Sequence, residues 1–173
     1  MGFILIVDDE KNVLTTLSIG LKRRNYTVKT AQNGKQAINL LKKGGCEALV
    51  SDIRMSPMDG YELAARVRKG DPRLPIVLMS AFNVDEKHYQ KIEELSCSRL
   101  VKPFTVDELV QVIEREIKKG EKGRIAVLGT AAERKKIRRV LEYAGFFMHV
   151  LTSNGNMKKQ LASIESDLII VDG

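Results

Sequence analysis

The chain has 173 residues, which suits either one large domain or one full domain with a smaller appendage. Hydrophobic residues make up 43% and charged residues 29%, a composition that excludes an intrinsically disordered chain. The formal net charge of +7 would suit an acidic partner, but the excess is not gathered in a basic arm. The densest basic cluster, at residues 134–139, predicts the solvated face of one helix instead.

The sequence shows no pattern typical of a signal peptide, a membrane span or a paired-cysteine motif. The apolar stretch at residues 3–7 is too short for a signal-peptide core, and no stretch approaches the roughly 20 apolar residues of a membrane span. Cys46 and Cys97 fit neither a CxxC motif nor a metal-ligand spacing, so we expect two reduced, mostly buried thiols. We therefore expect a cytoplasmic protein that makes no contact with a membrane.

Apolar runs alternate with amphipathic stretches along the first 120 residues. The run at residues 3–7 is stopped by acids, as in a strand buried on both faces. Leu14, Leu17 and Leu21 then form the apolar stripe of a helix, and Asn33 is placed to cap the next one. Strands are expected at residues 3–7, 26–30, 48–53, 76–80 and 99–102, with helices between them and a last helix that begins in a capping box of Thr105 and Glu108. Five such units predict an α/β fold with a doubly wound, five-stranded parallel sheet.

The pattern restarts after a charged, glycine-containing linker at residues 118–123. Thr130 and Glu133 predict another capping box, and Asn154 with Gly155 repeats an earlier Asn-Gly turn. Further strands are expected at residues 125–128, 147–151 and 168–171. We therefore divide the chain into a domain at residues 1–120 and a partial βαβαβ segment at residues 121–173, which is expected to be truncated after its third strand.

Polar side chains stand at the carboxyl ends of the predicted strands. Asp8 and Asp9 follow the first strand, Asp52 ends the third, and Ser80 and Lys102 end the fourth and fifth. The carboxyl ends of parallel strands meet at one edge, where ligands bind, so three carboxylates are expected to converge there. At about 4 Å and an effective dielectric of about 20, each like-charged pair costs about 4 kcal/mol. The cluster should therefore bind a cation or raise one of its pKa values.

Hard oxygen ligands with room for water favour magnesium as that cation. A carboxylate nucleophile, a divalent cation, a lysine and a hydroxyl are the parts that in-line phosphoryl transfer needs. The sequence therefore predicts a phosphate-binding pocket at this edge.

Four sequence blocks resemble the signatures of response-regulator receiver domains. They are I-L-I-V-D-D-E at residues 4–10, D-I-R-M-S-P-M-D-G at 52–60, M-S-A-F at 79–82 and V-K-P-F at 101–104. The intervals between the blocks also agree with the family, and the resemblance covers residues 2–120. It implies a flavodoxin-like fold, as in the chemotaxis receiver.

The resemblance implies a phosphorylation-activated switch of a two-component phosphorelay. Asp52 would accept the phosphoryl group, and Ser80 and Lys102 would contact it. Mg²⁺ would be held by Asp8, Asp9, Asp52 and the backbone carbonyl of Arg54. Such a switch is not an enzyme beyond promoting its own phosphorylation and dephosphorylation. Its partners would be a histidine kinase or phosphotransfer protein, a second copy bound through the helix 4, strand 5, helix 5 face or the C-terminal segment, and nucleic acid only through an output domain beyond residue 173.

One switch position departs from the family. Phosphorylation in the family draws the hydroxyl residue inward, and an aromatic three residues before the lysine follows it. That position is Arg99 here, and a guanidinium does not suit an apolar slot. We therefore expect Arg99 to point outward between helices four and five, solvated or paired with an acid. Together with Phe82, it is predicted to serve as a switch or interface residue.

Two other functions occur on related folds. An aspartyl-phosphate phosphatase is the alternative, but it would have a second acid two residues after its nucleophile, where this chain has Arg54. A flavin-binding module would place a phosphate after the first strand, where Asp8, Asp9 and Glu10 would repel it.

The C-terminal segment resembles the first half of another receiver. Asp172 stands where a phosphoacceptor would, but Gly129 and Thr130 replace the metal-binding acids. The segment is therefore predicted to be a pseudo-receiver used for contacts, unless its likeness is one of topology alone. Three strands with an open edge are marginal by themselves, so we expect the segment to dock on a neighbour or a second chain.

Overall fold

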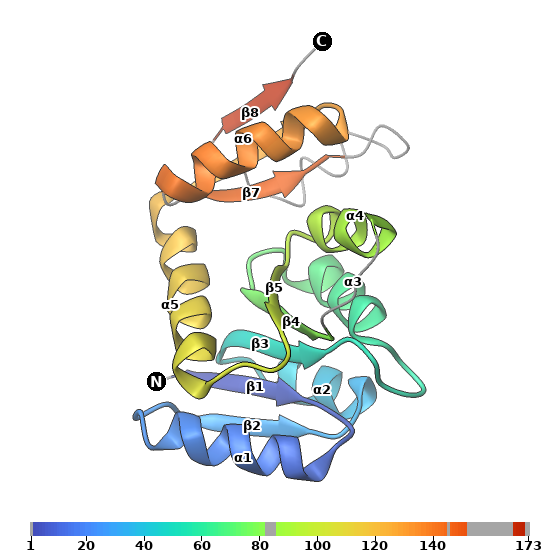
Figure 1. Cartoon of the computed structure of the whole chain (residues 1–173), viewed down its shortest axis with the longest axis vertical. Helices are drawn as coiled ribbons and strands as arrows, with labels where there is room; N and C mark the ends of the chain where they lie inside the picture. Colours follow the sequence, from blue (N-terminus) through green and yellow to red (C-terminus); the bar gives the residue numbers. More distant parts are fainter. Residues whose placement is uncertain (1, 82–85, 145, 152–167, 172–173) are drawn as a thin grey trace.

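The computed structural model describes residues 2–81, 86–144, 146–151 and 168–171. These residues form a five-stranded sheet and a three-stranded sheet. Figure 1 shows the two sheets as separate layers, with the long helix α5 running from one to the other. Within this described part of the chain, no helix is both long enough and apolar enough to cross a membrane.

The larger sheet has the strand order β2-β1-β3-β4-β5, and the pairs are parallel. Its strands are β1 (Phe3–Val7), β2 (Val28–Ala31), β3 (Cys46–Asp52), β4 (Ile76–Ser80) and β5 (Ser98–Val101). The order reverses between β1 and β3, so the crevice beyond their carboxyl ends is the place where such a sheet binds ligands. The predicted doubly wound, five-stranded sheet is confirmed.

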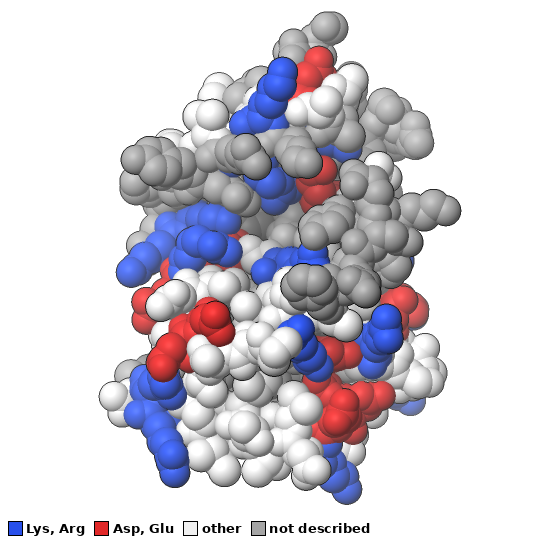
Figure 2. Space-filling model, viewed as in Figure 1, with Lys and Arg blue, Asp and Glu red and all other residues white. Residues whose placement is uncertain are grey.

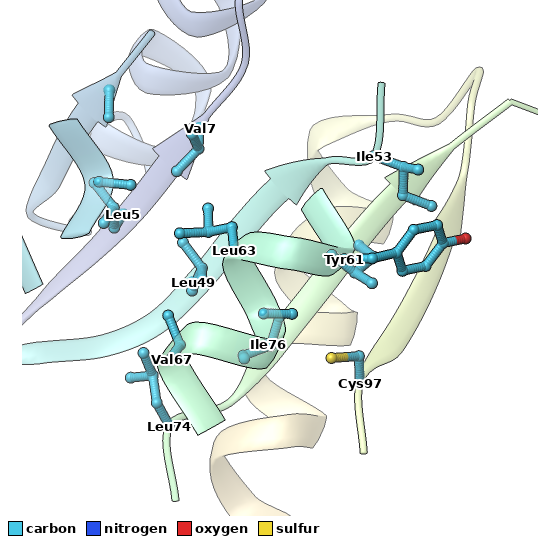
Figure 3. Packing of buried hydrophobic residues seen from close by; sticks show 14 of the residues in the cluster. Leu5, Val7, Leu49, Ile53, Tyr61, Leu63, Val67, Leu74, Ile76 and Cys97 are labelled. Carbon is cyan, nitrogen blue, oxygen red and sulfur yellow. The ribbon is translucent and has the colours of Figure 1, made fainter. Parts of the chain in front are cut away.

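Helices cover both faces of this sheet. The core against α1 (Lys11–Lys22) and α5 (Val106–Lys122) includes Leu17, Val50 and Ile113. The other core lies against α2 (Gly34–Leu41), α3 (Gly60–Gly70) and α4 (Glu86–Glu94). Figure 3 shows Leu49 of β3 facing Leu63 and Val67 of α3 in this second core. Burial on both faces explains why the strands read as continuous apolar runs.

The helix starts follow the predicted capping residues. Asn33 Oδ1 accepts a hydrogen bond from Gln36 N at 2.9 Å. At the start of α5, Thr105 N donates to Glu108 Oε2 at 2.7 Å, and Glu108 N donates to Thr105 Oγ1 at 3.2 Å. Both interactions satisfy backbone N–H groups that the first helical turn leaves without partners.

The predicted linker at residues 118–123 is wrong, because α5 continues to Lys122. Lys119 Nζ lies 2.8 Å from Glu116 Oε1, and both side chains are almost fully buried. This i,i+3 ion pair ties the last turns together where charge and glycine content predicted a loop. Gly123, with φ of 125°, ends the helix in a backbone conformation that favours glycine.

The smaller sheet has the order β7-β6-β8, with β6 at its centre. Its elements are β6 (Arg124–Leu128), α6 (Ala131–Ala144), β7 (Phe147–Val150) and β8 (Leu168–Val171). Thr130 and Glu133 form the predicted capping box. The strand order matches β2-β1-β3 of the larger sheet, while Asn154, Gly155 and Asp172 lie outside the described residues. The receiver-like character of this unit and the division of the chain into two domains stay predictions.

Candidate functional site at the carboxyl edge of the sheet

Two buried carboxylates lie at the carboxyl ends of neighbouring central strands. Asp8 directly follows β1, and Asp52 is the last residue of β3. The pairing of Val7 with Ser51 sets the two strand ends side by side. The side chain of Asp8 is 1% exposed and that of Asp52 is 11% exposed, so their negative charges need a compensating partner.

Lys102 supplies that partner from the end of β5. Its Nζ lies 2.6 Å from Asp52 Oδ1 and 3.3 Å from Asp8 Oδ2. Its backbone N donates to Ser80 O at 2.7 Å, which fixes the chain beside β4. Partial burial acts to lower the pKa of Lys102, but the hydrogen bonds and charges of Asp52 and Asp8 outweigh it, so the pKa is raised above its ordinary value. The ammonium is therefore charged at neutral pH.

Backbone amides hold the two carboxylates in place. Arg54 N donates to Asp52 Oδ2 at 2.7 Å, and Glu10 N donates to Asp8 Oδ1 at 2.9 Å. Each carboxylate thus binds an amide through one oxygen and Lys102 through the other. Two such bonds per side chain hold both carboxylates in one orientation before any ligand binds.

The expected convergence of three carboxylates is wrong. Asp9 is exposed, and in the described residues no three His, Cys, Asp or Glu side chains are grouped closely enough to hold a metal ion. The physical reason is that Asp9 follows Asp8 directly, and neighbouring residues at a strand end point in different directions, so Asp8 is buried while Asp9 is exposed. Two buried carboxylates with a third acid next in the chain still suit magnesium, which keeps several waters and takes one or two carboxylates.

Ser80 and Arg99 form a contact that the sequence reasoning missed. Ser80 is the last residue of β4 and is 4% exposed. Arg99 Nε donates to Ser80 Oγ at 2.8 Å. The expectation that Arg99 points outward therefore fails for its Nε, which donates to a buried hydroxyl at the neighbouring strand end. Phe82, the other predicted switch residue, lies outside the described residues.

Charged groups of both signs are visible near this edge. In Figure 2, acidic side chains gather on the side of the molecule toward which β1 and β3 point in Figure 1, and basic side chains border them. Acidic side chains bordered by basic ones suit the joint binding of an anionic group and a cation better than the binding of an anion alone or a cation alone.

A doubly wound parallel sheet with two buried aspartates and a lysine at its carboxyl edge defines the class of flavodoxin-like proteins that carry an acidic pocket. The family model of the response regulator receiver domain matches residues 4–114. The chain therefore belongs to this family, whose members are the phosphoacceptor switches of two-component signal transduction and generally use Mg²⁺ at the acidic site.

Curated relatives agree with this assignment. The chain is 31% identical over 116 residues to the DNA-binding transcriptional regulator NtrC of Escherichia coli, a match that covers 67% of this chain and 25% of that protein. It is 32% identical over 124 residues to the nisin biosynthesis regulatory protein NisR of Lactococcus lactis, covering 72% of this chain and 54% of that protein. The chain thus spans between a quarter and about half of the length of these two relatives.

Solved structures agree as well. The chemotaxis protein CheY4 of Vibrio cholerae superposes with a TM-score of 0.62 at 27% identity, covering 66% of this chain and 98% of that one. This likeness confirms the predicted flavodoxin-like fold for the larger sheet and its helices.

Proposed function

We propose that Asp52 accepts a phosphoryl group from a histidine kinase or phosphotransfer protein, and that the chain thereby acts as a signalling switch. The observation that carries this proposal is the 2.6 Å contact between Asp52 Oδ1 and Lys102 Nζ, at an edge where Asp8 adds a second buried carboxylate. Its own phosphorylation and dephosphorylation would be the only reactions that such a switch promotes.

In this proposal a carboxylate oxygen of Asp52 attacks the phosphorus of the donor. The bond from phosphorus to the leaving nitrogen of a phosphohistidine breaks, and its electron pair stays on that nitrogen. The positive charge of Lys102 stabilises the negative charge on the transferred phosphoryl oxygens, and Ser80 donates its O–H to one of them. Mg²⁺ adds charge stabilisation when bound. The residues that would hold it are Asp8, Asp9, Asp52 and the backbone carbonyl of Arg54.

The first prediction tests this assignment. Incubation with Mg²⁺ and acetyl phosphate should add a single phosphoryl group, measured by intact-protein mass spectrometry, and Asp52→Asn should abolish the gain because the amide is not a nucleophile. Asp107→Asn is the matched control, since Asp107 is exposed and pairs with Arg24 away from the pocket. Equal labelling of Asp52→Asn and the unsubstituted chain would contradict the proposal.

Further partners follow from the fold. A second copy could bind through α4, β5 and α5 or through the C-terminal unit, and nucleic acid would be contacted only through an output domain. The phosphatase alternative is not favoured, because position 54 supplies its backbone N–H to Asp52 and carries an exposed arginine instead of an acid.

A further inference from the structure

Arg99 contacts Ser80, one of the residues of the proposed phosphoryl site. It belongs to β5 and is half-buried, and its Nε donates to Ser80 Oγ at 2.8 Å. Ser80 itself is buried at the end of β4. The guanidinium therefore contacts, through Nε, the buried hydroxyl that is proposed to meet the phosphoryl group.

The strand register explains how the two side chains meet. Arg99 pairs with Leu78 and Val101 pairs with Ser80, so Arg99 lies two pairs further from the carboxyl edge than Ser80. Side chains alternate between the faces of a sheet, and paired residues share a face. Arg99, Leu78 and Ser80 thus stand on the same face, and the guanidinium reaches Ser80 by extending along it toward the edge.

The direction of the hydrogen bond determines what Ser80 can do. A hydroxyl has one donor and two acceptor lone pairs. The Nε–H of Arg99 fills an acceptor position, which leaves the O–H proton of Ser80 available for another acceptor. Donation from a cation also polarises the hydroxyl and makes its own proton a stronger donor.

We propose that Arg99 is a positioning residue for phosphorylation: its Nε–H holds Ser80 Oγ so that the Ser80 O–H is directed to a phosphoryl oxygen on Asp52. This inference rests on the proposed function of Asp52. Arg99 acts through Ser80 and does not itself touch the phosphoryl group. Because Arg99 is part of β5, the same bond ties the state of the pocket to the position of that strand.

The test is a double-mutant cycle on the rate of Asp52 phosphorylation by acetyl phosphate with Mg²⁺. Arg99→Met keeps an apolar stem without the donor and should slow phosphorylation about fivefold, the effect of losing one hydrogen bond of about 1 kcal/mol. Ser80→Ala should slow it as well. Adding Arg99→Met to Ser80→Ala should cause no further loss, because the hydroxyl that Arg99 positions is gone. In Ser80→Thr, which keeps a hydroxyl, the sensitivity to Arg99→Met should return.

Arg66→Met is the control for the loss of one positive charge, since Arg66 is exposed on α3 and pairs with Glu62. It should leave the rate unchanged. Additive losses from Arg99→Met and Ser80→Ala would overturn the positioning role and indicate that Arg99 acts on the phosphoryl group or on the fold. An unsubstituted chain that gains no label would overturn the proposed function of Asp52 and this inference with it.

A second measurement needs no substitution at Arg99. The Arg99 Nε–H proton should exchange slowly with water in the nuclear magnetic resonance spectrum of the unphosphorylated chain, because Ser80 Oγ accepts it. Ser80→Ala should speed this exchange about fivefold, again the equivalent of one hydrogen bond. Exchange that is equally fast in both chains would overturn the inference whether or not Arg99→Met folds.

Discussion

At the scale of single residues, Gly60 decides how the loop after β3 closes on the proposed phosphoacceptor. Its backbone N donates to Ile53 O at 3.0 Å. A Cβ at this position would lie 2.3 Å from Asp52 O and 3.0 Å from Ile53 Cα. Because both neighbours are backbone atoms, they cannot rotate away, and the loop accommodates only glycine here.

The corresponding prediction is that Gly60→Ala lowers the free energy of unfolding by about 1–3 kcal/mol, the usual range for overpacking, and also slows phosphorylation of Asp52. Gly70→Ala at the other end of α3 is the matched control. A Cβ there meets nothing within 4 Å, so alanine should leave stability unchanged or raise it slightly. Chemical denaturation of the two variants gives the comparison, and equal stabilities would show that the loop adapts to the methyl group.

Part of the site could be predicted residue by residue, and the reason is geometric. Asp8, Asp52 and Lys102 follow directly from strand ends and strand order, since a parallel sheet brings its carboxyl ends to one edge. Asp9 could not be placed, because neighbouring residues at a strand end point in different directions. Arg99 could not be placed either. The end of a long side chain is set by the acceptors around it, which the strand pattern does not reveal.

At the scale of elements, the capping box of α5 couples that helix to pH. The backbone N–H and the hydroxyl of Thr105 donate to the carboxylate of Glu108, and these bonds lower the pKa of Glu108 from its ordinary value of 4.5. A lowered pKa means that the ionised form is favoured by folding. The stabilisation is therefore present above 4.5 and is lost as the pH falls through the folded-state pKa.

We expect Glu108→Gln to lower the free energy of unfolding at neutral pH, because the amide carries no charge to strengthen the cap. The difference from the unsubstituted chain should shrink toward zero as the pH falls below 4.5. Denaturant titrations across this pH range measure it. Glu94→Gln, at an exposed position in α4, provides the control. A difference that stays constant with pH would rule out the carboxylate as its source.

Element types could be predicted more reliably than the end of α5. Apolar runs and capping residues act locally, so the strand β4 and the caps at Asn33 and Thr105 follow from short stretches of sequence. The last turns of α5 depend instead on the burial of Glu116 and Lys119. Burial of a charged pair is a tertiary effect, and charge pattern alone predicted a solvated linker there.

At the scale of the whole molecule, the C-terminal unit lies against the receiver through α4 and α5. Both helices contact β7, as Figure 1 also shows for the region between the sheets. Arg138 Nη2 of α6 donates to Glu93 O of α4 at 3.3 Å, and its Nε lies 3.6 Å from Glu93 Oε1. The basic cluster of α6 was predicted to be a solvated face, which is wrong for Arg138, whose side chain is 21% exposed.

This arrangement places the C-terminal unit and the proposed phosphoryl site at opposite ends of β5. Ser98, at the start of the strand, borders a small cavity together with Phe146 and Met148. Lys102 follows the end of the strand. One end of β5 therefore lies at the proposed phosphoryl site and the other packs beside the C-terminal unit. A movement of the strand would be a physical route for coupling between the two units.

The last prediction concerns the contact between α6 and α4. Arg138→Ala removes a charged donor from the half-buried Glu93. It should lower the free energy of unfolding by about 1–2 kcal/mol, as expected for a hydrogen bond from a charged, partly exposed donor. The backbone amides of α4 should then exchange faster with deuterium, because the helix loses a partner on its outer side. Lys136→Ala is the control, since Lys136 is exposed on the same helix and its loss changes the net charge equally. If both variants leave the exchange of α4 unchanged, Arg138 does not hold the C-terminal unit against the receiver. If both accelerate it equally, the effect comes from net charge, because only the contact with Glu93 distinguishes the two positions.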